Sequence, residues 1–225
     1  DGAEIIFDAD GDGLSDLSKT FYSDSNGVAQ INLTYQDFIA FDTNQNGKID
    51  SFEGRFIARG GIDTSTETPF SGVLIADANA SVVSPLTTLV AKIMDTGVPK
   101  ESAIVMTAQA LGIDTSIDLT TYDPILETAL GNDEQAGAVL VANLRMANLI
   151  NQSEGLLLAI AEEYEGMTVG DQLLDQIAQA ILSAPGSQLD MEEVLSTAIP
   201  AAIQSVDHAQ ELDDIFNSIE KEEEL

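Results

Sequence analysis

The chain has no cysteine and no tryptophan, and it has a single histidine, His208. Without cysteine, disulfides, thiolate metal sites and cysteine nucleophiles are all excluded. His208 follows Asp207 in a polar stretch, but a serine triad would also need a Gly-x-Ser-x-Gly elbow, which the sequence lacks. The glycine motifs that hold nucleotide phosphates are missing as well. We therefore expect a protein that is not an enzyme. A paired-carboxylate hydrolase is the remaining catalytic alternative, but nothing singles out one pair.

Positive charge is also scarce, since 8 basic residues stand against 39 acidic ones, giving a formal net charge of −31. Such a surface repels phosphate backbones and anionic lipids, so nucleic acid and membrane surfaces are not expected partners, whereas divalent cations are attracted. No apolar run approaches the roughly 18 to 20 residues that a membrane span needs. The first residues carry no signal-like segment, as expected of a mature product or an excised fragment.

Aromatic residues make up only 5% of the chain against 44% hydrophobic residues, so its core must be mainly aliphatic, which suits packed helices. The sequence changes character near residue 80. Before that point, polar and glycine-rich stretches surround short apolar runs that predict strands or partly formed helices, at residues 5–7, 28–33, 55–58 and 72–76. After it, apolar residues recur at helical spacing. We predict an α+β chain, with a small β-containing module over residues 1–80 and a mostly α-helical domain of about six helices over residues 81–225.

Capping residues divide the helical part. The predicted starts are Ser84-Pro85, Pro99, Asp123-Pro124, Thr168 with Asp171, and Asp190 with Glu193, and the predicted ends are Gly97, Gly112 and Gly131. The long apolar segment from 132 to about 165 predicts a buried central helix, or two helices broken near Gly155. Pro200 is expected to end or kink its helix. Residues 207–225 carry an apolar stripe and an acidic end that is expected to fray.

The most specific motif is DTNQNGKIDSFE, from Asp42 to Glu53. It matches the twelve-residue EF-hand calcium loop at every diagnostic position. Side-chain oxygens stand at positions 1, 3, 5, 9 and 12, glycine at position 6 permits the sharp turn, and position 7 offers a backbone carbonyl. The predicted calcium ligands are Asp42, Asn44, Asn46, the carbonyl of Lys48, Asp50 and Glu53.

A related loop, DADGDGLSD, precedes it. Aspartates stand at positions 1, 3, 5 and 9, and glycine again stands at position 6. Position 12 is Lys19, which cannot coordinate calcium, so Asp16 must compensate directly or the site is weaker. The residues before this loop favour a strand rather than an entering helix. The predicted ligands are Asp8, Asp10, Asp12, Leu14 and Asp16.

The stretch between the two loops, SDSNG, predicts a turn, because Asn and Gly both tolerate positive φ. A contribution of Asp24 or Asn26 to calcium binding is the less favoured interpretation.

The succession DADGDGLSD, SDSNGVAQI, DTNQNGKIDSFE and VVSPLTTLV resembles modules of large secreted or surface-attached bacterial calcium-binding proteins. These are adhesin-like chains that combine cadherin-like, B-repeat-like or EF-hand loops. The resemblance covers roughly residues 3–125. It implies calcium loops that lie between β-strands, and a location outside the cell.

These features predict a non-enzymatic, calcium-binding module of a bacterial secreted or cell-surface protein, with an adhesion or structural scaffold role. Calcium is the expected cofactor, and protein or carbohydrate at a cell surface is the expected class of partner. The alternative is a calcium sensor or buffer whose helical domain binds a protein. The methionines are scattered along the chain, which disfavours the methionine-rich groove typical of sensors.

Overall fold

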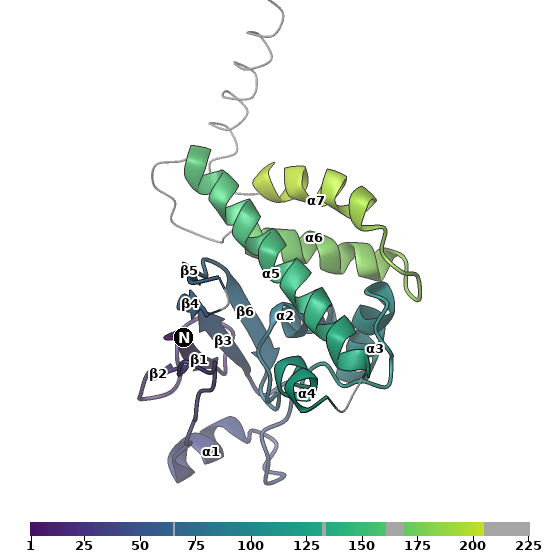
Figure 1. The fold of residues 1–225 in the computed structure, drawn as a ribbon. Coiled ribbons are helices and arrows are strands. Elements are labelled where there is room, and N and C mark those ends of the chain that lie inside the picture. Colours follow the sequence, from purple (N-terminus) through teal and green to yellow (C-terminus); the bar gives the residue numbers. More distant parts are fainter. Residues whose placement is uncertain (65, 132–133, 161–168, 205–225) are drawn as a thin grey trace, which may run out of the picture.

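The computed structural model describes residues 1–64, 66–131, 134–160 and 169–204. It confirms the α+β class, because an antiparallel sheet in the N-terminal part is followed by a mostly helical part (Figure 1). Among the described residues, no helix is long and apolar enough to cross a bilayer.

The main sheet has four antiparallel strands in the order β2-β1-β3-β6. Their bounds are β1 Glu4–Asp8, β2 Phe21–Tyr22, β3 Arg55–Arg59 and β6 Val73–Asp77, and a second sheet pairs β4 Ile62–Asp63 with β5 Thr68–Pro69. Asp8 at the end of β1 is paired with Arg55 at the start of β3, and Arg55 is paired with Asp77 at the end of β6. The segments after β1, before β3 and after β6 therefore meet at one end of the sheet.

One described helix, α1 (Tyr35–Phe41), belongs to the sheet-containing part, and six follow it. Those six are α2 Pro85–Met94, α3 Lys100–Ala110, α4 Pro124–Leu130, α5 Glu134–Ile160, α6 Val169–Ser183 and α7 Met191–Gln204. The starts predicted from the capping residues of α2, α3 and α4 are confirmed. Thr168 and residues 207–225 lie outside the described residues.

Helix α2 joins the two parts of the fold, since it contacts β6 as well as α3, α5 and α6. Every residue from Pro85 to Ile93 is buried. Around it lies an aliphatic core whose largest fully buried members are Leu86, Leu89, Ile93, Met146, Ile150, Leu173, Leu174, Ile177 and Ile181. Each such side chain stabilises the fold by about 1.5–3 kcal/mol at most, so this cluster supplies the main stabilising term of the helical part.

Helix α2 packs against β6, the edge strand of the main sheet (Figure 1), and two of its hydroxyls bond to the backbone of that strand. The backbone N–H of Ile75 donates to Oγ1 of Thr88 at 2.8 Å, and Oγ1 of Thr87 donates to the carbonyl of Ile75 at 2.9 Å. Both threonines are buried. The segment VVSPLTTLV thus has a structural role, because it caps α2 with Ser84 and satisfies the outward-facing backbone groups of Ile75, the middle residue of an edge strand.

Some of the few basic residues form ion pairs between elements that are distant in sequence. Arg55 makes a bidentate pair with Asp95 after α2, with both nitrogen–oxygen distances at 3.2 Å. Lys92, whose side chain is 8% exposed, lies 2.8 Å from Asp171 and from Asp175 of α6. These ion pairs tie α2 to the sheet on one side and to α6 on the other.

Of the two alternatives for the long apolar segment, the structure has the single helix, because α5 continues through Gly155; a helical glycine costs only about 1 kcal/mol and the burial of neighbours such as Ile150 offsets it. Two other expectations about elements are corrected. Helix α7 continues past Pro200 to Gln204, with Ala198 and Ala202 buried on either side of the proline. Residues 28–33 form neither strand nor helix.

Candidate metal centre

The two predicted loops, loop 1 (residues 8–19) and loop 2 (residues 42–53), lie at the same end of the main sheet. Loop 1 follows β1, as its sequence predicts. Loop 2 is entered from helix α1 and left into strand β3, so it combines the entering helix of an EF-hand with an exit into a strand. The two loops are adjacent because Asp8, the first predicted ligand of loop 1, is the register partner of Arg55, which stands just beyond the end of loop 2.

Loop 1 folds back on the carboxylate of Asp8, which is 2% exposed. This carboxylate accepts the N–H of Gly11 at 2.7 Å and the N–H of Gly13 at 3.2 Å. Gly13 has a φ of 78°, a conformation that a side chain would strain. The glycine at position 6 therefore permits the turn because it tolerates this positive φ, as the motif predicts.

Three of the predicted ligands of loop 1 converge. One carboxylate oxygen from each of Asp8, Asp10 and Asp16 lies within 4.8 Å of the other two. Asp16 is oriented by the N–H of Ala9, which donates to it at 2.6 Å. Carboxylates this close repel one another unless a cation lies between them, and calcium takes oxygen ligands at about 2.3–2.6 Å. Within the described part of the chain, no other group of acidic or histidine side chains has this spacing.

The remaining predicted members of loop 1 lie outside this group. The carboxylate of Asp12 accepts the N–H of Leu14 at 2.8 Å, and the side chain of Leu14 is exposed. Lys19 at position 12 is also exposed. Coordination by Asp12 and by the carbonyl of Leu14 stays a prediction.

Loop 2 folds in the same way around Asp42, which is 7% exposed. Its two carboxylate oxygens accept the N–H groups of Asn46 and Gly47, both at 2.9 Å. Gly47 has a φ of 87°. The first aspartate of each loop therefore accepts the N–H of the glycine at position 6.

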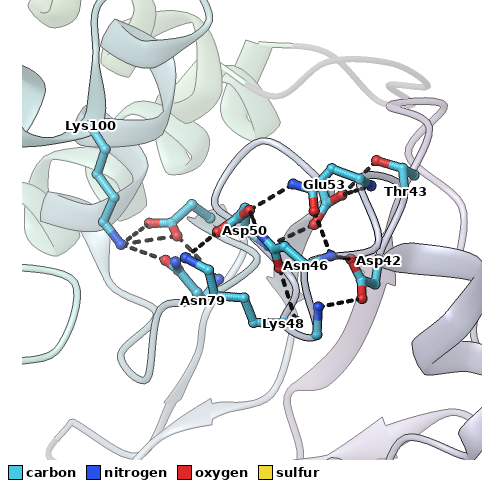
Figure 2. A network of polar contacts seen from close by, with 11 residues as sticks. Asp42, Thr43, Asn46, Lys48, Asp50, Glu53, Asn79 and Lys100 are labelled. Atoms are coloured by element: carbon cyan, nitrogen blue, oxygen red, sulfur yellow. Dashed lines mark hydrogen bonds and ion pairs between the residues drawn. The ribbon is translucent and has the colours of Figure 1, made fainter.

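Glu53 closes loop 2 from its far end, as Figure 2 shows, and it is 4% exposed. Its carboxylate accepts the N–H of Asp50 at 2.8 Å, the N–H of Asn44 at 3.0 Å and the hydroxyl of Thr43. These donors, the Asp50 N–H foremost, hold the pKa of Glu53 below its usual value. Glu53 is thus a preformed carboxylate that links both halves of the loop. The sequence did not indicate the contribution of Thr43.

Asp50 already has cationic and amide donors around it. Nζ of Lys48 lies 2.7 Å from one carboxylate oxygen, and the side-chain amides of Asn44 and Asn46 donate to the other at 2.8 and 2.6 Å. Lys48 is the main cause of the lowered pKa of Asp50. For Asp50 to bind a cation, the Lys48 ammonium must swing away and both amides must turn to present oxygen. The three carboxylates that lie close enough together to share a cation are therefore those of loop 1, and the acidic side chains of loop 2 do not form such a group.

Gly54 is a position whose importance the sequence did not reveal. Its φ is 138°, and a Cβ there would lie 2.6 Å from the ring of Phe7 and 3.1 Å from the carbonyl oxygen of Asp8. Only glycine lets the end of loop 2 pass this close to the start of loop 1.

The turn between the loops is confirmed. The carboxylate of Asp24 accepts the N–H groups of Asn26 at 2.8 Å and of Val28 at 3.0 Å. These bonds, the one from Val28 foremost, lower the pKa of Asp24. Asp24 is not a member of the converging carboxylate group.

A third acidic position at this end of the sheet was missed. Asp77 is 4% exposed, and Nζ of Lys100 lies 3.0 Å from its carboxylate and 2.7 Å from Oδ1 of Asn79 (Figure 2). Lys100 therefore supplies the compensating charge there. The sequence feature that could have indicated this position is Asp-x-Asn at the end of a buried strand.

No protein-family model, curated protein or solved structure matches this chain. The function has to be argued from the geometry of the site. That geometry offers hard oxygen ligands, which suit calcium or magnesium rather than metals that prefer sulfur or imidazole.

Proposed function

We propose that the chain is a calcium-stabilised, non-enzymatic module of a secreted or cell-surface protein, with an adhesion or scaffold role. Calcium binds in loop 1 through Asp8, Asp10 and Asp16, and in loop 2 around Asp42 and Glu53. The convergence of the three loop 1 carboxylates within 4.8 Å is the observation that carries the proposal.

Calcium in this proposal organises one end of the sheet. The two loops adjoin through the pairing of Asp8 with Arg55, and Arg55 in turn contacts Asp95 after α2. A cation that relieves repulsion in loop 1 therefore stabilises strands that also hold the helical part. Binding to the folded state alone stabilises it by about 2.7 kcal/mol at a hundredfold excess of ligand over Kd.

An extracellular location fits sites of this kind. Extracellular calcium modules bind with Kd values on the order of 10⁻⁴–10⁻³ M, which fill at the calcium concentration outside cells. The absence of a position 12 ligand in loop 1 and the donors around Asp50 in loop 2 both favour such modest affinity.

A scaffold role is favoured over a sensor role by the placement of three methionines in the described part of the chain. Met146 is buried in the helical core, and Met94 and Met106 pack against that core. They do not form the exposed methionine-rich groove with which sensors bind their targets.

Calorimetric titration of the chain with calcium tests the proposal. We expect binding at loop 1 to disappear in an Asp8→Asn, Asp16→Asn variant, and binding at loop 2 to disappear in an Asp42→Ala, Glu53→Gln variant. An Asp118→Asn variant, which changes a carboxylate in the helical part, is the matched control and should keep full stoichiometry. The absence of calcium-dependent heat, together with equal thermal midpoints in calcium, magnesium and chelator, would show that the loops are only turns.

A further inference from the structure

A cavity of about 560 Å³ lies on one face of the main sheet. Its lining includes Ile5, Ala58 and Leu74, which are register partners in one row across β1, β3 and β6. Further lining residues come from residues 27–31 and from residues 80–85, and most of them are aliphatic. The volume is in the range of sites that hold ligand groups, and none of the predicted calcium ligands lines it.

Ala29 and Ile31 line this cavity, and the segment to which they belong, residues 29–33, has the burial pattern of a strand. Ala29, Ile31 and Leu33 are partly buried, whereas Gln30 and Asn32 are exposed. This alternation is typical of extended chain. Within the described part of the chain, however, residues 29–33 make no backbone hydrogen bond. An extended segment without a pairing partner therefore stands beside an apolar cavity.

We propose that the cavity and residues 29–33 together form a docking groove for an extended peptide segment of a partner protein. The peptide adds a strand to residues 29–33, so that backbone hydrogen bonds supply affinity. Ala29 and Ile31 both line the cavity, so alternate side chains of the added strand enter the same space. The aliphatic lining selects small aliphatic side chains at these alternate positions.

Charge defines the partner further. The chain carries a net charge of −31, and Asp1 and Asp63 are among the lining residues, so lysine or arginine flanking the aliphatic positions is favoured. A second copy of this chain brings the same net negative charge and is repelled. A small apolar molecule would fill the cavity but would leave the backbone groups of residues 29–33 without partners.

The test uses the full chain and a set of synthetic, fluorescently labelled peptides. Each peptide has a lysine at both ends, threonine at one set of alternate positions, and valine, isoleucine, leucine or alanine at the other set. Fluorescence anisotropy measures binding in calcium and in chelator. We expect a subset of these peptides to bind. Methylating the alternate backbone nitrogens of a binding peptide removes several backbone hydrogen bonds, each of which contributes modestly to affinity. We expect this to weaken the binding of that peptide on the order of tenfold or more.

Paired variants locate the site. Ala29→Leu adds bulk toward the cavity, whereas Gln30→Leu adds similar bulk at the neighbouring exposed position. We expect Ala29→Leu to weaken binding on the order of tenfold and Gln30→Leu to leave it unchanged. Ala58→Leu, which fills the cavity from β3, should act like Ala29→Leu. Far-UV circular dichroism and the thermal midpoint check that each variant is folded.

Several results would overturn the proposal. One is that no peptide of the set binds the folded chain. Another is that the N-methylated peptides bind as well as their parents, or that Ala29→Leu and Gln30→Leu behave alike. Binding of an apolar dye without any peptide would assign the cavity to small molecules, and self-association in sedimentation would assign this face to a second copy. Because the peptide assay is run with and without calcium, its outcome does not depend on whether the loops bind metal.

Discussion

The ring centroid of Phe7 lies 4.7 Å from that of Phe41, and the residue that follows each phenylalanine is the first predicted ligand of a loop. Phe56 of β3 lies 5.1 Å from Phe7 as well. The two Phe-Asp pairs therefore begin their loops from one aromatic cluster, so we expect a change in the packing of one loop to affect the other.

A Phe41→Leu substitution tests this coupling. We expect it to destabilise the chain by about 1 kcal/mol, since an aromatic pair contributes about 0.5–1.5 kcal/mol beyond its buried area. Calcium titration should show weaker binding at both loops. Phe52→Leu is the matched control, because Phe52 is also in loop 2 but is 74% exposed, and it should leave both affinities unchanged. Weakening confined to loop 2 would contradict the coupling.

The role of the Thr88 hydroxyl at the edge of β6 can be tested by comparing valine substitutions at two buried threonines. Thr88→Val keeps the shape but leaves the N–H of Ile75 without an acceptor, so we expect a loss of about 1–3 kcal/mol in chemical denaturation. Thr107 is 0% exposed and its hydroxyl has no hydrogen-bond partner among the described residues, so Thr107→Val should be neutral or stabilising. Equal effects of the two substitutions would refute a specific role for the Thr88 hydroxyl.

The ion pairs of Lys92 should matter far more than those at the surface. Lys92→Met leaves Asp171 without its cation at a largely buried position, and we expect a loss of about 3 kcal/mol. Burial raises the pKa of Asp175, with Lys92 opposing that shift, so Asp175→Asn should cost less than Lys92→Met. Lys48→Met removes an ion pair whose lysine is 68% exposed and screened by solvent, so it should change stability far less than Lys92→Met. Thermal and urea unfolding of the three variants measures this order, and a Lys48 effect as large as that of Lys92 would contradict it.

Acid should open loop 2 in calcium-free protein. The pKa of Glu53 is lowered from its usual 4.5, so the hydrogen bonds to its carboxylate stabilise the loop above that value and are lost as pH falls through the lowered pKa. NMR of the Asn44 and Asp50 amides should follow this transition, and Glu53→Gln should abolish it. A midpoint at or above that of Glu53 in a short unfolded peptide would reverse the expected sign.

What the sequence predicts well is local. Ser84 and Pro85 begin a helix because a cap acts on its own first turn, and Gly13 and Gly47 mark turns because their φ values are required within the loop itself. The helical part was therefore predicted from its caps and apolar spacing. Helix α1 was missed, although Thr34 and Asp37 form a capping box at its start.

The contacts between distant residues could not be predicted in the same way. Nothing near Thr88 in the sequence indicates that it accepts from Ile75, and Lys100 is separated from Asp77 by the whole of α2. Similarly, the motif of loop 2 is complete, yet the donors around Asp50 are defined only by how the loop folds in three dimensions. Convergence in loop 1 depends on Asp16 turning back to Ala9.

The hydroxyls that cover Ile75 have a consequence for chains at high local concentration. An open edge strand is a template on which another molecule can pair and start an aggregate. In β6 the middle residue already has partners within its own chain, so neighbouring copies crowded on one surface find no template there. The two threonines thus block strand pairing at the middle of β6, in addition to holding α2 on the sheet.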